Sequence, residues 1–202
     1  REHVFTLAGQ VQRDFGTTHY LFNNAGVALG ATIEHATLEE IEWIMNINLW
    51  GVIYGTKAFL PMMLAQGEGH IVNTSSVWGL VAYPTNGAYC ITKFGVRALT
   101  ETLWRELQGT GVFATSVHPA GTKTGMTGGV RFGQFATDLE RDWDARQAAG
   151  HTTTPEQAAE KILAGVARKQ RRILVSNGST AIAWLARLFP TRYPALMRWM
   201  GV

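Results

Sequence analysis

Short apolar runs alternate with amphipathic helix patterns along nearly the whole of this 202-residue sequence. The helix pattern of residues 4–16 places its apolar residues on one face and ends at a glycine. The alternation continues with strands expected at 19–26, 70–76, 112–121 and 172–177, and helices expected at 38–45, 48–67, 87–107 and from 154 onward. Strands that are apolar throughout are typical of a parallel sheet with helices on both faces. We therefore expect one α/β domain over residues 1–202, built on a doubly wound parallel sheet.

The connection between residues 121 and 151 is longer than most and is expected to be irregular. It combines several glycines with Met126, Phe132, Phe135 and Trp143. Long connections of this kind usually serve as lids over a site or are disordered. We expect a substrate lid over a mainly apolar pocket.

The composition, 46% hydrophobic and 16% charged, is that of a globular chain. Cys90 is the single cysteine, which excludes an internal disulfide and leaves no cysteine spacing for a metal. This usage favours a reducing compartment. We expect a cytoplasmic protein with neither a metal nor a nucleic-acid partner.

Basic residues concentrate toward the end of the chain. From Lys161 onward there are eight Lys or Arg and no acidic residue, although the whole chain carries only +3. Residues 178–202 add Trp, Leu and Met and are expected to form a basic helical tail. Such a tail can pack on its own core or on a neighbouring subunit, or make peripheral contact with an anionic membrane. Arginines interrupt its apolar run, so we expect no membrane-spanning helix.

Polar residues follow three of the expected strands, at 23–26, 74–76 and 118–121. Because ligands of parallel sheets bind outside the carboxyl ends of the strands, these segments predict one common site. Tyr89 and Lys93 stand one helical turn apart, so the ammonium can approach the phenol and lower its pKa. Tyr89 then suits general acid/base chemistry, and the Ser76 hydroxyl can hold a substrate oxygen beside it.

These residues also have purely structural interpretations. Ser76 can be a turn or cap residue, and Asn48 can cap the second helix of its region. His70 and His118 are interpreted as strand residues rather than ligands. The alternatives remain open at this point.

The order and spacing of five motifs resemble the short-chain dehydrogenase/reductase family over essentially the whole chain. The motifs are "NNAG" at 23–26, Asn48 in "NINLWG", Ser76, the Tyr89/Lys93 pair and "HPAGTKT" at 118–124. The resemblance implies a Rossmann-type sheet and NAD or NADP as cofactor. It also implies a homodimer or homotetramer, in which the helix that carries Gly51 and Gly55 and the tyrosine-bearing helix form the interface.

The same resemblance implies individual roles. Lys93 would bind the nicotinamide ribose hydroxyls, and Asn48 would hold a water that relays protons to Lys93. The implied cofactor-binding residues, which include the catalytic pair, are Asn23, Ala25, Gly26, Tyr89, Lys93, Pro119, Ala120, Thr122 and Thr124. The implied catalytic residues are Ser76, Tyr89, Lys93 and Asn48.

Two departures from the family pattern are visible. Ala120 replaces a usual glycine, and its methyl group disfavours a positive φ in the turn; Thr122 stands where Val or Ile is usual. We also expect the first two βα units, about 60 residues at roughly 30 each, to be missing from this chain. The glycine-rich phosphate cradle would be lost with them, and the strand at 19–26 would become an unpaired apolar edge.

Two functions are carried forward. The first is hydride transfer between NAD(P) and a moderately hydrophobic secondary alcohol or ketone, with Tyr89 as general acid/base. The second is a cofactor-free fragment or oligomerising scaffold without catalytic activity. Binding of NAD(P)H distinguishes the two.

Overall fold

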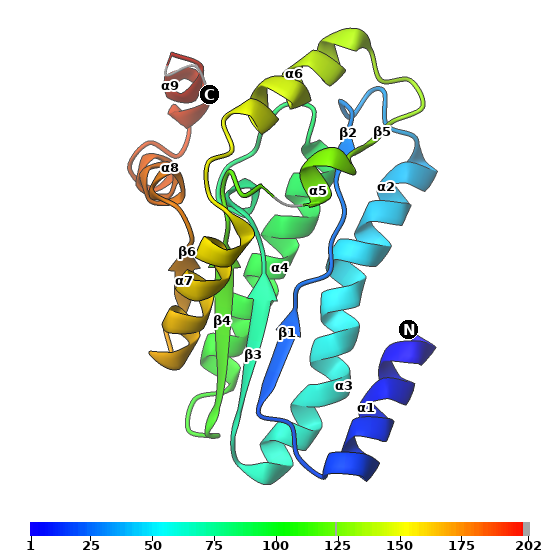
Figure 1. Ribbon diagram of the computed structural model, residues 1–202, viewed down its shortest axis with the longest axis vertical. Helices are drawn as coiled ribbons and strands as arrows, with labels where there is room; N and C mark the ends of the chain where they lie inside the picture. The colour runs from blue at the N-terminus through cyan, green and yellow to red at the C-terminus, as the bar shows by residue number, and fades with distance from the viewer. Residues whose placement is uncertain (124, 200–202) are drawn as a thin grey trace.

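A parallel sheet of four strands, in the order β1-β3-β4-β6, forms the centre of the molecule (Figure 1). The computed structural model describes residues 1–123 and 125–199. The strands are β1 (Tyr20–Asn23), β3 (Gly69–Thr74), β4 (Val112–His118) and β6 (Arg172–Leu174). The predicted α/β class with a parallel sheet is confirmed.

Helices cover both faces of the sheet. α3 (Gly51–Gln66) and α4 (Gly87–Glu106) lie on one face, and α7 (Pro155–Ala167) lies on the other over β4 and β6 (Figure 1). Ile71 points to the α3/α4 face and its neighbour Val72 to the α7 face, as successive strand residues must. The α3/α4 core comprises Met63, Ile71, Leu103, Leu107, Val112 and Ala114, and the α7 core comprises Val72, Val117, Ala158, Val166, Ile173 and Val175.

Local sequence signals determine where several helices begin and end. α1 (Glu2–Phe15) ends at Gly16, whose φ of 73° is the left-handed conformation that glycine tolerates best. Thr37 and Glu40 form a reciprocal capping box at the start of α2 (Leu38–Met45). α7 begins in the same way, at Thr154.

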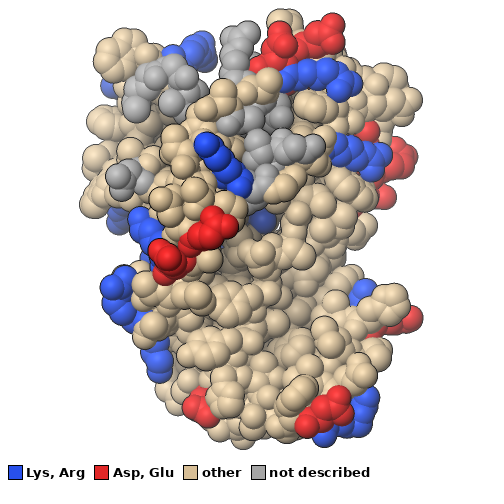
Figure 2. Space-filling view, viewed as in Figure 1, with Lys and Arg blue, Asp and Glu red and all other residues tan. Residues whose placement is uncertain are grey.

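β1 is an edge strand that pairs with β3 alone among the described residues. Tyr20 and Phe22 are 57% and 44% exposed on the face opposite α3. Figure 2 shows an uncharged surface over this part of the sheet. The edge strand therefore has the apolar exposed character that its sequence predicts.

The expectation of an irregular connection at 121–151 is wrong. This segment contains α5 (Gly125–Gly128), β5 (Arg131–Phe132) and the 12-residue α6 (Asp138–Ala149). β5 pairs in parallel with β2 (Leu29–Gly30), and α6 spans the carboxyl ends of the strands (Figure 1). The segment is ordered by polar anchors, which apolar periodicity does not reveal.

Two buried carboxylates provide those anchors. Glu140 of α6 accepts backbone N–H bonds from Thr32 and Thr137, both at 2.6 Å. Glu40 of α2 accepts from the backbone N–H of Gln134 at 2.9 Å. Both glutamates are about 95% buried, with exposures of 4% and 5%. The segment is thus fastened to the loop and helix that follow β2.

The tail folds into α8 (Asn177–Leu188) and α9 (Tyr193–Trp199). Met197 joins a cluster with Val81, Tyr83 and Cys90, and the Tyr193 hydroxyl accepts the Ala82 N–H at 3.0 Å. The tail therefore packs on its own core, while apolar residues remain exposed on its outer side, namely Trp184, Leu188, Phe189 and Trp199. Within the described part of the chain, no helix is long and apolar enough to cross a membrane.

Candidate active site

The four expected catalytic residues come from three different elements near the carboxyl ends of β1 and β3. Ser76 precedes the 3₁₀ helix η2 (Val77–Gly79), Tyr89 and Lys93 lie in the first half of α4, and Asn48 lies in the π-helix η1 (Asn46–Trp50). All four side chains are buried, from 0% exposure for Asn48 to 8% for Tyr89.

Tyr89 and Lys93 lie together as their spacing predicts. Lys93 Nζ is 5.5 Å from the centroid of the Tyr89 ring and donates to the Thr74 carbonyl at 2.9 Å. Burial lowers the pKa of Lys93 to about 8. Because of this lower pKa, the Lys93 ammonium releases a proton more easily than the ammonium of an exposed lysine does.

The predicted lowering of the Tyr89 pKa is not what the structure gives. Burial raises the pKa of Tyr89 to about 12, and the hydrogen bond with the Ser76 side chain lowers it only in part. The physical reason is that loss of hydration penalises the phenolate more than these neighbours stabilise it. The phenol is therefore protonated at neutral pH.

Ser76 is both a cap and a member of the site. Its hydroxyl accepts the Trp78 N–H at 3.2 Å, while its carbonyl accepts from His118 Nδ1 at 2.8 Å. His118 Nε2 must then accept from the Ser116 hydroxyl, which lies at 2.9 Å. Burial is the main reason why the pKa of His118 falls to about 4, so this histidine is neutral at pH 7. The position of Ser76 thus depends on a residue of β4.

A close approach between the η2 loop and α4 supports the lysine from the other side. The Ser75 hydroxyl donates to the Lys93 carbonyl at 2.8 Å. A Cβ added at Gly79 would lie 2.3 Å from Ser75 Oγ and 2.7 Å from the Lys93 carbonyl oxygen. Only glycine fits there. Sequence reasoning missed Ser75, Gly79 and the role of His118, because each has a partner that is distant in sequence: Lys93 for the first two and Ser76 for the histidine.

Asn48 does not cap a helix, since it lies inside the continuous run from α2 through η1 to α3. Its amide pairs with the backbone of Val27, accepting from N–H at 2.8 Å and donating to C=O at 2.9 Å. Its Nδ2 also reaches the Thr92 hydroxyl at 3.3 Å. The side chain thereby holds the segment after β1 against α4.

Asn23, the last residue of β1, and the residues that follow it have different surroundings. Asn23 donates its amide to Asn73 Oδ1 at 2.8 Å and so points into the protein, while Ala25 is exposed. A Cβ added at Gly26 would lie 3.3 Å from Asn48 Oδ1 and 3.4 Å from Lys93 Nζ. Gly26 thus borders the lysine directly.

Gly51 and Gly55 of α3 are the small residues expected in close helix contacts, but Gly55 faces a strand residue of its own subunit. A Cβ there would lie 2.2 Å from Asn23 Oδ1, so this glycine makes room for the amide at the end of β1. Gly51 has nothing closer than the Asn46 carbonyl at 4.0 Å.

The turn after β4 keeps an ordinary backbone at Ala120. Its positive φ, 55°, falls on Gly121, so the methyl group of Ala120 causes no strain. Pro119 accepts the Val77 N–H at 3.0 Å. The Thr122 hydroxyl is buried and has no hydrogen-bond partner in the described part of the chain. Thr124 lies outside the described residues.

A parallel sheet that gathers such residues at its carboxyl edge places the chain among the Rossmann-type α/β proteins. The family model described as short chain dehydrogenase matches residues 1–134. A putative oxidoreductase, SadH, of Mycobacterium tuberculosis is 40% identical over 201 residues, which cover 98% of this chain and 72% of that protein. Human estradiol 17-beta-dehydrogenase 11 is 30% identical over 98% of this chain and 62% of its own length.

Solved structures agree with these relatives. A short-chain dehydrogenase/reductase from Burkholderia phymatum in complex with NAD superposes with a TM-score of 0.82 at 29% identity, over 91% of this chain and 70% of that one. The chain belongs to the short-chain dehydrogenase/reductase family, whose members are oxidoreductases.

Proposed function

We propose that this chain provides the acid/base centre of an NAD- or NADP-dependent oxidoreductase that interconverts a moderately hydrophobic secondary alcohol and its ketone. The observation that carries the proposal is the burial of Ser76, Tyr89 and Lys93 together at the carboxyl edge of the sheet. Support for the cofactor comes from the relative crystallised with NAD.

The residues around Lys93 fit the nicotinamide end of such a cofactor. Gly26 lets the backbone approach Lys93 Nζ so closely that an added Cβ would lie 3.4 Å from it, and the Thr122 hydroxyl, which has no partner among the described residues, can bond a carboxamide. Lys93 would hold the ribose hydroxyls, and the bound cofactor would supply or accept the hydride. NAD and NADP remain alternatives, because the residues that distinguish them bind the far end of the cofactor.

Tyr89 performs the proton transfer in this proposal. Its protonated phenol donates to the substrate oxygen during reduction, and Ser76 holds the same oxygen through its hydroxyl. Lys93, with its pKa near 8, then replaces the proton. Asn48 would hold the relay water, through its backbone in the π-helix or through the second lone pair of its Oδ1, since Val27 occupies only one of them.

Apolar residues beside Tyr89 favour a hydrophobic substrate. Trp43, Trp78 and Met126 pack around the cluster that contains Tyr89. Met126 belongs to the segment at 121–151, which we propose as the substrate lid. One of the relatives, human estradiol 17-beta-dehydrogenase 11, is named for a hydrophobic alcohol, which supports a hydrophobic substrate here.

The catalytic proposal is tested with the gene product, expressed with any residues that precede Arg1. NAD(P)H absorbance is followed with hydrophobic secondary alcohols and ketones. Tyr89→Phe should reduce kcat by about 10²–10⁴-fold, the usual contribution of a general acid/base. Tyr54→Phe, on α3, serves as the control. Turnover that survives Tyr89→Phe would refute the assignment.

The scaffold alternative concerns the 202 residues alone. The exposed edge of β1 favours it, since such an edge recruits other chains. Calorimetry of NADH and NADPH with this exact chain distinguishes the two functions. Tight binding would reject the scaffold, and absence of binding would support it for the isolated chain.

We also propose a homodimer or homotetramer formed through α3 and α4. Leu64 of α3 and Ile91 and Phe94 of α4 are 38–50% exposed, and Trp50, the last residue of η1 before α3, is 43% exposed. Phe94→Glu should shift the chain toward a monomer in analytical ultracentrifugation.

The tail supports a second proposal, because Trp184 and Trp199 are exposed beside basic residues. We propose that it binds peripherally to anionic membranes, in a cytoplasmic, membrane-associated protein. Co-sedimentation with phosphatidylserine vesicles, absent with phosphatidylcholine alone, checks this.

A further inference from the structure

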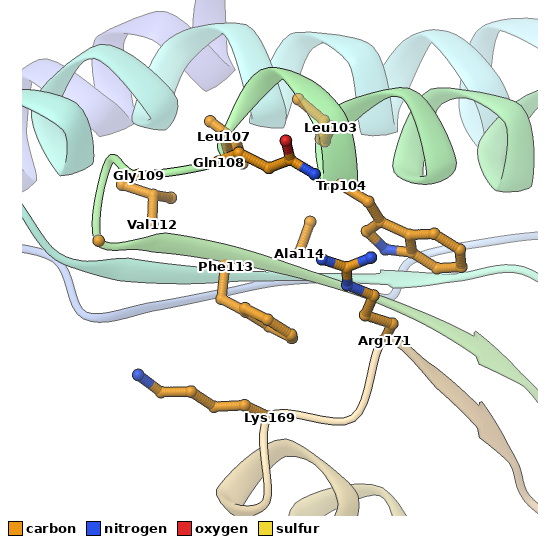
Figure 3. Close-up of a pocket in the computed structure, with 11 residues that line it drawn as sticks. Leu103, Trp104, Leu107, Gln108, Gly109, Val112, Phe113, Ala114, Lys169 and Arg171 are labelled. Carbon is orange, nitrogen blue, oxygen red and sulfur yellow. The ribbon is translucent and has the colours of Figure 1, made fainter.

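A second cavity lies at the opposite end of the sheet from Tyr89. It has a volume of about 320 Å³ and lies between the C-terminal part of α4, the start of β4 and the connection from α7 to β6 (Figure 3). Trp104 on its wall is 15 residues after Tyr89 on the same helix, which corresponds to roughly 22 Å along the axis. The volume is within the range of small-ligand sites.

One wall of this cavity carries a hydrogen-bond donor with nothing to bond. The indole Nε1 of Trp104 is buried and has no partner among the described residues. The Arg171 guanidinium carbon lies 6.0 Å from the centroid of the same indole, and Figure 3 shows its nitrogens on the side of the ring that carries Nε1. Two donor-only groups therefore face one space, and the only side-chain acceptor among its described lining residues is the amide oxygen of Gln108. An unpaired buried donor is costly, so an acceptor from outside the fold would bind there favourably.

The charge around the cavity has one sign. Lys169 and Arg171 both line it, and neither has an acidic partner among the described residues. Lys169 adopts a φ of 50° where α7 ends, because its N–H bonds to the Val166 carbonyl at 2.9 Å and the next N–H bonds to the Gly165 carbonyl at 3.0 Å, as in a Schellman turn. This turn places both cations in the short connection before β6.

The inner surface of the cavity is apolar. Leu103, Leu107 and Val112 line it and are each at least 93% buried within the α3/α4 core. A ligand must therefore combine an anionic group at the Trp104/Arg171 end with a compact apolar body. Inorganic phosphate satisfies only the first requirement, and a neutral alcohol only the second.

We propose that this cavity binds a small organic carboxylate, whose oxygens accept from Trp104 Nε1 and Arg171 while its apolar body lies on Leu103, Leu107 and Val112. The site is separate from the oxidoreductase centre and does not depend on the function proposed for it. The carboxylate can belong to a free molecule or to a side chain of a second copy, and we commit to the free molecule.

The test uses the 202-residue chain labelled with ¹⁵N at tryptophan, whose seven indole N–H signals are followed by NMR. The signal that disappears in Trp104→Phe is that of Trp104. Phenylacetate should shift this signal downfield in a saturable manner, because the N–H gains an acceptor. 2-Phenylethanol and inorganic phosphate, each lacking one of the two features, should bind at least tenfold more weakly.

Two arginine variants distinguish binding at this cavity from a general effect of positive charge. Arg171→Ala should weaken phenylacetate at least tenfold, as expected for loss of a charge-assisted hydrogen bond. Arg168→Ala removes the same charge three residues away, outside the cavity lining, and should change affinity less than twofold. Tyr89→Phe should leave the titration unchanged.

Three outcomes would overturn the proposal. The first is a Trp104 signal that phenylacetate does not shift. The second is an equal loss of phenylacetate affinity in the two arginine variants. The third is binding of 2-phenylethanol as tight as that of phenylacetate. A fourth is a Trp104 shift that depends on protein concentration without ligand and that phenylacetate does not reverse. That result would assign the carboxylate to a second copy.

Discussion

Glu140 should control how firmly the segment over the strand ends is attached. Oε1 accepts the Thr32 N–H and Oε2 accepts the Thr137 N–H, each at 2.6 Å. Glu140→Gln replaces one of these oxygens by an NH₂ group, so one backbone donor faces another donor. A lost charge-assisted bond and an unsatisfied donor together cost about 2–4 kcal/mol.

Limited trypsin digestion measures this release, because Arg141 lies in α6 itself. When opening is fast relative to cleavage, the cleavage rate follows the population of the open form. A cost of 2–4 kcal/mol corresponds to roughly 30- to 700-fold faster cleavage at about 1.4 kcal/mol per tenfold. Asp142→Asn, an exposed change on the same helix, should have less than a twofold effect.

The pH dependence has a definite sign. Burial by itself raises the pKa of Glu140, but hydrogen bonds from Thr137, Thr32 and His35 outweigh it and hold this pKa well below its usual range. The attachment is therefore intact above the unfolded-state pKa of about 4.5 and is lost as pH falls through the lower folded value. Equal cleavage of Glu140→Gln and the parent protein at pH 7 would refute the assignment of these bonds as the anchor.

Three further predictions concern stability. His118→Gln should remove part of the fall in stability expected between pH 6.5 and about 4, where the unfolded state binds extra protons at His118 and at the likewise buried His70, and urea titrations at pH 7 and 5 measure it. Lys93→Met should raise the free energy of unfolding at pH 7 by about 2 kcal/mol, because removing the buried ammonium gains about 3 kcal/mol and losing its bond to the Thr74 carbonyl costs about 1, with the gain shrinking between pH 8 and 10.5. Gly55→Ala should destabilise by about 1–3 kcal/mol in thermal unfolding, since its Cβ meets Asn23, whereas Gly51→Ala should not destabilise.

Elements with local signals could be predicted from the sequence. The Thr154 capping box and the apolar run of β4 both correspond to observed elements. α6 could not be predicted, because a buried glutamate anchors it in place of an apolar stripe. Caps and hydrophobic periodicity involve residues of a single segment, so they can be recognised in the sequence. Glu140 instead accepts a hydrogen bond from Thr32, which is 108 residues away in the sequence.

The same distinction applies to the site. The spacing of Tyr89 and Lys93 reports that they share a helix face, so their proximity follows from the sequence. The contact between His118 and the carbonyl of Ser76 spans 42 residues and depends on strand order. The direction of the Tyr89 pKa also needs the structure, because burial outweighs the neighbouring groups only once the site is assembled.

The π-helix at 46–50 has a consequence for insertions and deletions. One residue turns an α-helix by about 100°, and a π-turn accommodates one residue more than an α-turn does. Deleting a single residue there would let α2 continue into α3 as an ordinary helix and would keep Gly55 facing the amide of Asn23. An added residue has no such outlet and would rotate α3 by about 100°. A one-codon insertion in this turn should therefore be far more damaging than a one-codon deletion.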